Sequence, residues 1–324
     1  MQGPAVKLAL AGDTMLGRGV AAALGELPAP RLVAPEVAET ASEADLCVLN
    51  LECCISERGR PWPDPAKPFF FRAPPAATET LMQLGVDCVT LANNHALDFG
   101  AEALLDTLEH LRAAGIAYVG AGRNVEAARA PAVLDAGGFR LAVVALSDHP
   151  REYAAAAERP GIAYADLWHE PPPEWLLEAM RTPDADAVLA MPHWGPNMAA
   201  EPAQHVRRAA TALTEAGATL VAGHSAHVFQ GVAGRVLYDL GDFLDDYAVD
   251  PLLRNDRGLL FLVTLDRGGP RRLETVPLKL DYCHTRLAAG EDADWIRRRF
   301  RAACATLGTE VAEEEGRLVF EWRG

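Results

Sequence analysis

The stretch 221-VAGHSAHVFQ-230 carries two histidines, His224 and His227, in a turn rich in glycine, serine and alanine. The turn follows the apolar run 218–222, and a short run of alanine, leucine and valine bounded by a glycine is typical of a buried β-strand. The stretch therefore predicts a strand that presents two imidazoles at its carboxyl end. Other predicted strands of the chain end in the same way.

Short apolar runs alternate with longer amphipathic stretches along the chain, and this alternation predicts a layered α/β fold. Helices are expected at 101–115 and 203–217, each of which closes at a glycine. The last strands follow one another without long helices between them, which favours antiparallel pairing there. The predicted strands are 6–11, 45–51, 86–92, 140–146, 186–191, 218–223, 235–240, 258–265 and 272–280.

Polar side chains follow several of these strands at the point where each strand ends. Ligands of open α/β sheets bind at that edge, so we expect these side chains to converge there. Oxygen and imidazole ligands in such a mixture suit Mn, Zn or Fe, and their number exceeds what one tetrahedral ion needs. One or two divalent metal ions per chain are therefore expected, with a carboxylate bridging a pair. The residues are Asp13, Glu52, Asn93, Asn94, His95, His193, His224 and His227.

The charge balance of the 324 residues excludes some partners. Lys and Arg number 30 against 45 Asp and Glu, a net charge of −15 at pH 7, which disfavours nucleic acid and anionic membranes as partners. Half of the residues are hydrophobic and the mean hydropathy is +0.01, as in soluble globular proteins. The opening segment MQGPAVKLALAGD lacks the length and flanks of a signal peptide or membrane anchor. We expect a cytoplasmic protein.

The order of the short motifs GDTMLGRG, NLE, FRAPP, LANNHALDFG, HWG, GHSAHVFQ and LGDF resembles that of the CapA, or poly-γ-glutamate capsule-biosynthesis, family. That family is related to the calcineurin-like metallophosphatases, and the resemblance runs from about Val6 to Asp245. It implies an α/β fold, a four-layer α/β/β/α metallophosphatase-like sandwich with mixed sheets. The expected organisation is a domain over 1–282 and a C-terminal helical and strand extension over 283–324 packed on the core.

The resemblance also implies a role for each strand-end residue. It implies that Asp13 and His227 bind a first metal, that Asn94, His193 and His224 bind a second, and that Glu52 bridges both. His95 would be the general acid or a transition-state donor. Asp98, three residues later, would face His95 and fix its tautomer.

The chain departs from the metallophosphatase pattern at several positions. That pattern begins Asp-x-His, whereas 13-DTM-15 offers no imidazole, so the first metal is expected to be held more weakly than the second. Glu52 is longer than the usual bridging aspartate, and Ala96 stands where an acid commonly follows His95. Asp242 stands where the CapA family commonly has asparagine.

Other residues near these motifs are candidates for substrate binding. Arg18, Lys67 and Arg72 could bind an anion, with surface exposure or ion pairing as the alternative. Lys67 and Arg72 lie in the Pro-rich stretch 61–75, which is predicted to be a surface loop or a loop that covers the site. Trp194, beside His193, would either wall the pocket or pack in the core.

Asp148 and His149 follow the strand predicted over 140–146. They either reach the site or cap the strand end, and the pattern alone favours capping.

These features predict a metal-dependent hydrolase or transferase that acts on a small anionic substrate at a phosphate or carboxyl-derived centre. The resemblance points to a glutamate-type polymer or related amide-linked products, made alongside an ATP-dependent ligase. A non-catalytic accessory subunit of such a ligase system is the alternative. A plain phosphodiesterase or phosphomonoesterase is a third reading.

Overall fold

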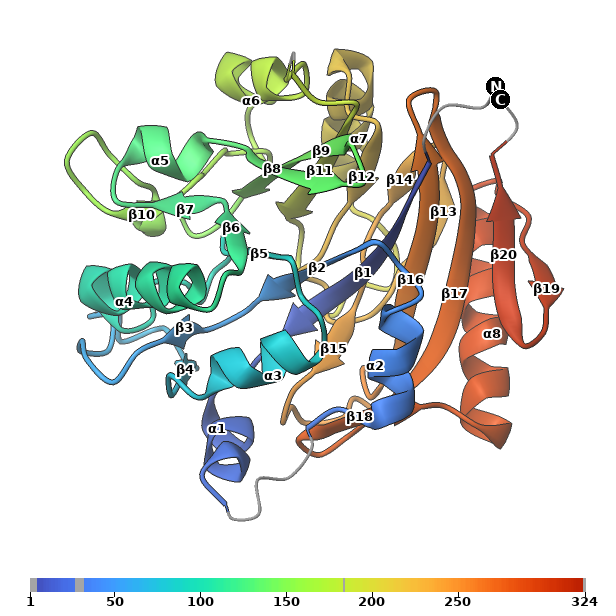
Figure 1. Ribbon diagram of the computed structural model, residues 1–324, viewed down its shortest axis with the longest axis horizontal. Helices are drawn as coiled ribbons and strands as arrows, with labels where there is room; N and C mark the ends of the chain where they lie inside the picture. Colours follow the sequence, from blue (N-terminus) through green and yellow to red (C-terminus); the bar gives the residue numbers. More distant parts are fainter. Residues whose placement is uncertain (1–4, 27–31, 183, 323–324) are drawn as a thin grey trace.

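Two β-sheets dominate the computed structural model, which describes residues 5–26, 32–182 and 184–322 (Figure 1). The larger sheet has ten strands in the order β19-β20-β17-β16-β1-β2-β5-β6, with β15 beside β1 and β18 beside β17. Its strands are β1 (Val6–Thr14), β2 (Leu46–Leu51), β5 (Cys88–Thr90), β6 (Ala117–Val119), β15 (Asp242–Leu244), β16 (Arg257–Asp266), β17 (Gly269–Asp281), β18 (His284–Leu287), β19 (Ala312–Glu314) and β20 (Arg317–Glu321).

The second sheet has six strands in the order β13-β14-β12-β11-β9-β8. They are β8 (Ala132–Ala136), β9 (Phe139–Ser147), β11 (Ala187–His193), β12 (Leu220–Ala222), β13 (Val232–Ala233) and β14 (Val236–Leu237). In both sheets the central strands that carry the site pair in parallel, whereas β16, β17 and β20 pair antiparallel. The antiparallel pairing expected for the last strands is confirmed.

Successive side chains of β1 point to opposite faces of the sheet and so belong to two different hydrophobic clusters. Ala9 and Ala11 face a cluster that includes buried side chains of the helices α2 (Pro35–Ala41), α3 (Ala77–Gln83) and α4 (Gly100–Ala113). Leu8 and Leu10 point the other way, into a cluster shared with Val143 of β9. A strand with a period of two thus covers both faces of its sheet with apolar side chains, and the second cluster lies between the two sheets.

The outer face of the six-stranded sheet is covered by α6 (Glu174–Ala179) and α7 (Gln204–Ala216), at the top of Figure 1. Val144 of β9 and Leu213 of α7 belong to this third cluster. The order of layers is therefore helices, ten-stranded sheet, six-stranded sheet, helices. This arrangement confirms the expected four-layer α/β/β/α sandwich with mixed sheets.

The segment after residue 282 is built into this sandwich. β20 pairs with β17 and β19 with β20, so the chain's last strands extend the larger sheet. Helix α8 (Gly290–Thr306) buries Ile296 and Phe300 in the cluster between the sheets, beside β17 and β20 (Figure 1). The helix and strands after residue 282 therefore share the core of the preceding residues.

The remaining elements are short. They are the helices α1 (Arg18–Leu24) and α5 (Val125–Arg129), a 3₁₀ turn at Arg151–Tyr153, and the strand pairs β3 (Cys54–Ile55) with β4 (Arg72–Ala73) and β7 (Ala121–Gly122) with β10 (Gly161–Ile162). Among the helices in the described part of the chain, none is long and apolar enough to cross a membrane.

Strand ends from both sheets meet at one edge of the sandwich. Asp13 near the end of β1 pairs in parallel register with Asp242 of β15. In the other sheet, an isolated bridge joins His193, the last residue of β11, to His224 in the turn after β12. The two sheets approach at this edge, because a carboxylate oxygen of Asp13 lies 3.4 Å from Nδ1 of His224.

Candidate metal centre

The turn that carries the two histidines after β12 is tightly constrained. A Cβ atom on Gly223 would lie 2.2 Å from Nε1 of Trp194 and 2.4 Å from the carbonyl oxygen of Tyr238, so only glycine fits there. Ser225 and His227 have φ angles of 121° and 58°. Positive φ at residues other than glycine is costly and concentrates at functional sites, where the surrounding structure holds it in place.

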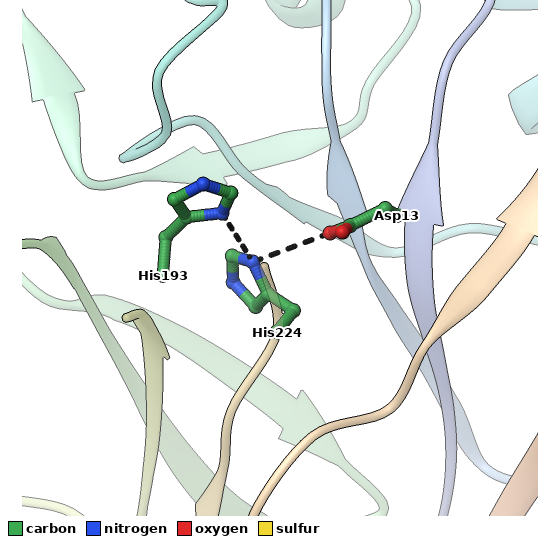
Figure 2. A group of neighbouring side chains, drawn as sticks. All are labelled: Asp13, His193 and His224. Carbon is green, nitrogen blue, oxygen red and sulfur yellow. Dashed lines mark hydrogen bonds and ion pairs between the residues drawn. The ribbon is translucent and has the colours of Figure 1, made fainter. Parts of the chain in front are cut away.

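One group of possible metal ligands combines residues of both sheets. Nδ1 of His193 lies 2.9 Å from Nδ1 of His224, which in turn lies 3.4 Å from Oδ1 of Asp13 (Figure 2). The three side chains are buried, and their ligand atoms lie within 4.8 Å of one another. Two imidazole nitrogens at this distance face the same point, as two nitrogen ligands of one ion do.

A second group of possible ligands shares Asp13 with the first. Nδ1 of His227 lies 2.8 Å from Oδ1 of Asp242 and 3.4 Å from Oδ2 of Asp13. These ligand atoms also lie within 4.8 Å of one another. Asp13 therefore offers one oxygen to each group, which is the arrangement of a carboxylate between two ions.

Glu52 was expected to bridge the ions, and it lies beside the two groups without belonging to either. Its carboxylate is fully buried, and Oε2 accepts a hydrogen bond of 3.3 Å from the hydroxyl of Tyr247. Oε1 lies 4.0 Å from Nε2 of His95 and has no hydrogen-bond partner.

Asp242 is the ligand candidate that the sequence pattern did not single out. Its only signal was the motif LGDF, read as a departure from the family's asparagine. Met15, which stands where the metallophosphatase pattern has a histidine, turns its Sδ to the backbone N–H of Gly17 at 3.0 Å. Asp242, rather than residue 15, therefore completes the group around His227.

Buried polar atoms without partners show that these residues fit a divalent ion. An unpaired buried oxygen or nitrogen costs on the order of 1–3 kcal/mol, so native proteins rarely leave several in one place. A hard or borderline cation would satisfy carboxylate, amide and imidazole ligands of this kind. The unpartnered atoms of these residues include Oδ2 of Asp13, Oε1 of Glu52, Oδ1 of Asn94 and Oδ2 of Asp242.

The carboxylates of the cluster compete for positive charge. Burial, followed by the negative charge of Asp13, raises the pKa of Glu52 well above its usual range. Burial likewise raises the pKa of Asp242, although the charge of His227 opposes it. Burial also acts to raise the pKa of Asp13, but the hydrogen bond from His224 and the nearby imidazole charges outweigh it and lower that pKa. A bound cation would oppose this effect of burial, because it favours the charged form of both carboxylates.

The imidazole of His193 is suited to metal binding. Burial, reinforced by the neighbouring imidazoles of His224 and His149, lowers the pKa of His193 well below its usual value. The ring is therefore neutral, which is the form that binds metals through a nitrogen lone pair.

His95 is held by a carboxylate with many hydrogen bonds. Its Nδ1 donates to Oδ2 of Asp98 at 2.6 Å, as expected. Asp98 also accepts from the backbone N–H of Phe71 at 2.6 Å and from the hydroxyl of Tyr153 at 3.1 Å, and it pairs with Nζ of Lys67 at 3.0 Å. Burial lowers the pKa of His95 to about 4 despite the charge of Asp98. The ring is neutral at pH 7 and leaves Nε2 free on the side of the cluster.

The Pro-rich stretch 61–75 supplies these supporting contacts. Phe71 stacks on His95 with ring centroids 3.9 Å apart. Lys67 donates to the carbonyl oxygen of Asn94 at 2.9 Å, in addition to its ion pair with Asp98. The stretch therefore builds the surroundings of His95, and Lys67 takes the ion-pairing alternative.

The two arginines proposed for substrate binding differ in position. Arg18 pairs with Asp246, and its guanidinium lies 5.2 Å from the ring centroid of Phe71, which itself stacks on His95. Arg72 donates to the carbonyl oxygen of Arg58 and lies over the ring of Phe99, and it has no recorded interaction with the two ligand groups among the described residues. Arg18 thus lies near the cluster, but its charge is balanced by Asp246. Arg72 lies away from the two ligand groups.

Trp194 is buried in the hydrophobic core. It is 2% exposed, its Nε1 donates to the carbonyl oxygen of Tyr238 at 3.0 Å, and it packs in the cluster between α7 and the six-stranded sheet. The expectation that it walls the site is wrong, because its ring is needed to fill the core beneath Gly223. His149, by contrast, reaches the site: its ring centroid lies 5.1 Å from that of His193.

Comparison with known proteins adds a family and relatives. A family model described as bacterial capsule synthesis protein PGA_cap matches residues 7–247. A Mycobacterium tuberculosis protein named "Probable polyglutamine synthesis accessory protein" is 31% identical over 297 residues, which cover 85% of this chain and 76% of that protein. The "Capsule biosynthesis protein CapA" of Bacillus anthracis is 29% identical over 213 residues, which cover 62% of this chain and 50% of that protein.

A solved structure shares the fold. The crystal structure of a hypothetical protein from Thermus thermophilus aligns with a TM-score of 0.50 at 17% sequence identity, over 84% of this chain and 99% of that chain. At this identity the likeness concerns the arrangement of the elements alone.

Proposed function

The chain belongs to the PGA_cap family of bacterial capsule synthesis proteins, and we propose that it is a metal-dependent enzyme acting on a phosphate- or carboxyl-derived group of an anionic substrate. Membership agrees with the resemblance drawn from the order of its motifs. The observation that carries the proposal is the position of Asp13, which offers one oxygen to each of two ligand groups that contain unpartnered buried atoms.

Two divalent ions, Mn, Zn or Fe, would be held by these groups. Asp13, His193 and His224 would hold one, with the unpartnered Oδ1 of Asn94 as a further ligand. Asp13, His227 and Asp242 would hold the other, with Oε1 of Glu52 nearby. Such ions supply Lewis-acid polarisation of a substrate oxygen when bound.

The charge of the cluster supports an anionic substrate only in the metal-loaded state. The carboxylates of Asp13, Glu52 and Asp242 are buried close together, and their negative charge by itself repels a phosphate or a carboxylate. Bound cations would reverse the sign of the local potential. The substrate class that we infer is a small anion or a glutamate-type polymer, the latter formed by an ATP-dependent ligase.

His95 would handle a proton next to the substrate. Asp98 holds Nδ1–H, so that proton movement in this ring takes place at Nε2, on the side of Glu52. The stacked ring of Phe71 restricts rotation of the imidazole and shields it from water. Such placement is typical of a general acid or base held in one tautomer by a carboxylate.

A second candidate function is a non-catalytic accessory subunit of a polyglutamate-type ligase system. The observation that favours it is the name of the Mycobacterium tuberculosis relative, which describes an accessory protein. In that case the metal cluster would serve stability or partner binding.

One experiment separates the two functions. Protein purified without chelator is measured for metal content and for turnover of a phosphomonoester, a phosphodiester and a γ-glutamyl amide. We expect one to two ions per chain, turnover of at least one substrate class, and loss of both metal and turnover in His193→Ala. His169→Ala is the control, because His169 is 80% exposed in its side chain and, among the described residues, pairs with Asp166 alone. Full metal content without turnover of any substrate would favour the accessory function, and a metal-free protein whose stability ignores added divalent ions would exclude both.

A further inference from the structure

A second pair of aspartate and histidine lies against the cluster, on the side of the six-stranded sheet. Asp148 follows the last residue of β9, and its side chain is fully buried. It accepts a hydrogen bond from Nδ1 of His149 and another, of 2.9 Å, from the backbone N–H of Gly195. Its Oδ2 also lies 3.5 Å from Nε2 of His205. The carboxylate is thus fixed from three sides, and it fixes the ring of His149.

His149 repeats the arrangement of His95 from the opposite sheet. In each pair a buried aspartate holds Nδ1, at 2.6 Å for Asp98 and His95. The ring of His95 approaches Glu52, and the ring of His149 lies 5.1 Å from that of His193. The cluster is therefore flanked by two oriented imidazoles, one from each sheet.

The remaining nitrogen of His149 faces solvent. Nδ1 is engaged by Asp148, and Nε2 has no recorded hydrogen-bond partner among the described residues. Nε2 of His149 is not a buried atom without a partner, whereas Nε2 of the adjacent His193 is one. The side chain is 29% exposed, whereas His193 and His224 are buried. An oriented nitrogen at the exposed margin of a buried cluster is available to a ligand that enters from solvent.

A capping role explains only part of this geometry. Backbone groups of residues 147–149 already have partners, because the hydroxyl of Ser147 donates to the carbonyl oxygen of His149 and the N–H of Asp148 donates to the carbonyl oxygen of His193. Nothing in these backbone bonds needs an imidazole, and a ring held at Nδ1 leaves one nitrogen free.

We propose that His149 is a further substrate-contacting residue of this site, whose Nε2 accepts a hydrogen bond from a protic oxygen or nitrogen of the anionic ligand bound at the cluster. The inference rests on the proposed function, since it needs a ligand at the metal groups. A phosphate that carries a hydroxyl and an amide that carries an N–H both offer such a donor. Asp148 is a positioning residue, because it acts through His149.

Two substitutions of His149 separate a contact with the ligand through Nε2 from the structural hydrogen bond to Asp148 through Nδ1. Asparagine places an amide nitrogen near the position of Nδ1, so His149→Asn keeps a donor for Asp148 and removes Nε2. Glutamine reaches the position of Nε2, so His149→Gln keeps an acceptor there and loses the bond to Asp148. His169→Asn, in the exposed pair with Asp166, is the matched control.

The ligands used are inorganic phosphate, which carries at least one hydroxyl at pH 7, and sulfate, which carries none. Affinity is measured by titration calorimetry on the metal-loaded full chain, with metal content and melting temperature recorded for each variant. We expect His149→Asn to keep its metal and melting temperature, to bind phosphate about 5- to 10-fold more weakly, and to bind sulfate as the wild type does. His149→Gln should bind phosphate more tightly than His149→Asn, although it melts at a lower temperature.

A purely structural His149 would give the reverse order, with His149→Asn like the wild type and His149→Gln impaired for both anions; that order would overturn the inference. Equal loss of phosphate and sulfate binding in His149→Asn, or a wild type that binds no phosphate, would also overturn it. Turnover by the wild-type protein is read separately. Turnover together with unchanged phosphate affinity in His149→Asn would leave the proposed function standing without this contact.

Discussion

Asp13 and Asp242 face each other across the parallel ladder of β1 and β15, and both carboxylates are buried. Like charges at paired strand positions repel each other, and burial strengthens the repulsion. His227 moderates it with Nδ1 2.8 Å from Asp242 and 3.4 Å from Asp13. The pair is therefore costly in the metal-free protein and favourable around a cation, so metal binding and stability are coupled at this point.

Asp242→Asn should make the protein less responsive to added metal. In the metal-free protein the change relieves repulsion with Asp13 but also removes a carboxylate partner of His227, so these two effects on stability oppose each other. The same change removes an anionic ligand, so added Mn or Zn should raise the melting temperature of the variant less than that of the wild type. Thermal melts with and without metal check this. An identical metal-induced rise in the two proteins would place Asp242 outside the metal site.

His95→Asn should separate proton handling from metal binding. The variant should retain metal and fold, because His95 belongs to neither ligand group, while turnover falls by ~10²–10⁴. Tyr153→Phe is the matched change, since it removes one hydrogen bond to Asp98 and leaves His95 in place. Kinetics on samples of equal metal content provide the measurement, and wild-type turnover in His95→Asn would refute the role.

Asp98→Asn should be costly to stability as well as to turnover. Asp98 is the buried partner of Lys67, and breaking a buried ion pair by removing one partner costs about 3 kcal/mol or more. A double substitution, Asp98→Asn with Lys67→Met, should recover part of the loss because no buried cation is left unpaired. Denaturant unfolding of the single and double variants tests this, and an equally unstable double variant would contradict the ion-pair explanation.

Gly223→Ala should damage both the fold and the metal site. The added Cβ would meet Trp194 and the Tyr238 carbonyl well inside contact distance, and overpacking of this kind costs about 1–3 kcal/mol or more. The turn that carries His224 would shift, and metal content should fall. Gly25→Ala is the control, because the nearest atom to its added Cβ lies 3.4 Å away. Equal melting temperature and metal content in the two variants would disprove the packing constraint.

Acid should weaken the ion pairs of Asp256, a residue that belongs to neither ligand group. Burial acts to raise the pKa of Asp256, but hydrogen bonds from Arg254 and Lys279 outweigh it and lower that pKa to about 2. The folded pKa is below the unfolded one, so the contribution to stability is present above about pH 4 and is lost as the pH falls towards 2. We expect about 1 kcal/mol after solvent screening. The difference in unfolding free energy between wild type and Asp256→Asn should shrink over this range; a constant difference would refute the assignment.

The layered architecture was predictable because it depends on local pattern. The alternation of Leu8, Ala9, Leu10 and Ala11 already implies a strand with two apolar faces, and such strands need a layer on each side. Asp13, His193 and His224 were predictable as neighbours for a related reason, since the carboxyl ends of parallel strands lie at one edge.

Other parts of the site depend on contacts between distant segments. The partners of Lys67 and Trp194 could not be read from their neighbours in the chain. A lysine can be exposed or ion-paired, and a tryptophan can line a pocket or pack in a core, without changing the local pattern. The loop over 61–75 takes its role from the position of Asp98, which a different element supplies.

By itself, the sequence determined the alternation of strands and helices, the sandwich that follows from it, and the strand ends at which polar ligands gather. Only the tertiary structure decided that Asp242 joins Asp13, and that the ring of His149 lies against His193. The physical reason is the distance along the chain over which each feature is decided. Side-chain periodicity is set by backbone geometry over a few residues, whereas these meetings depend on which strands pair and in what register.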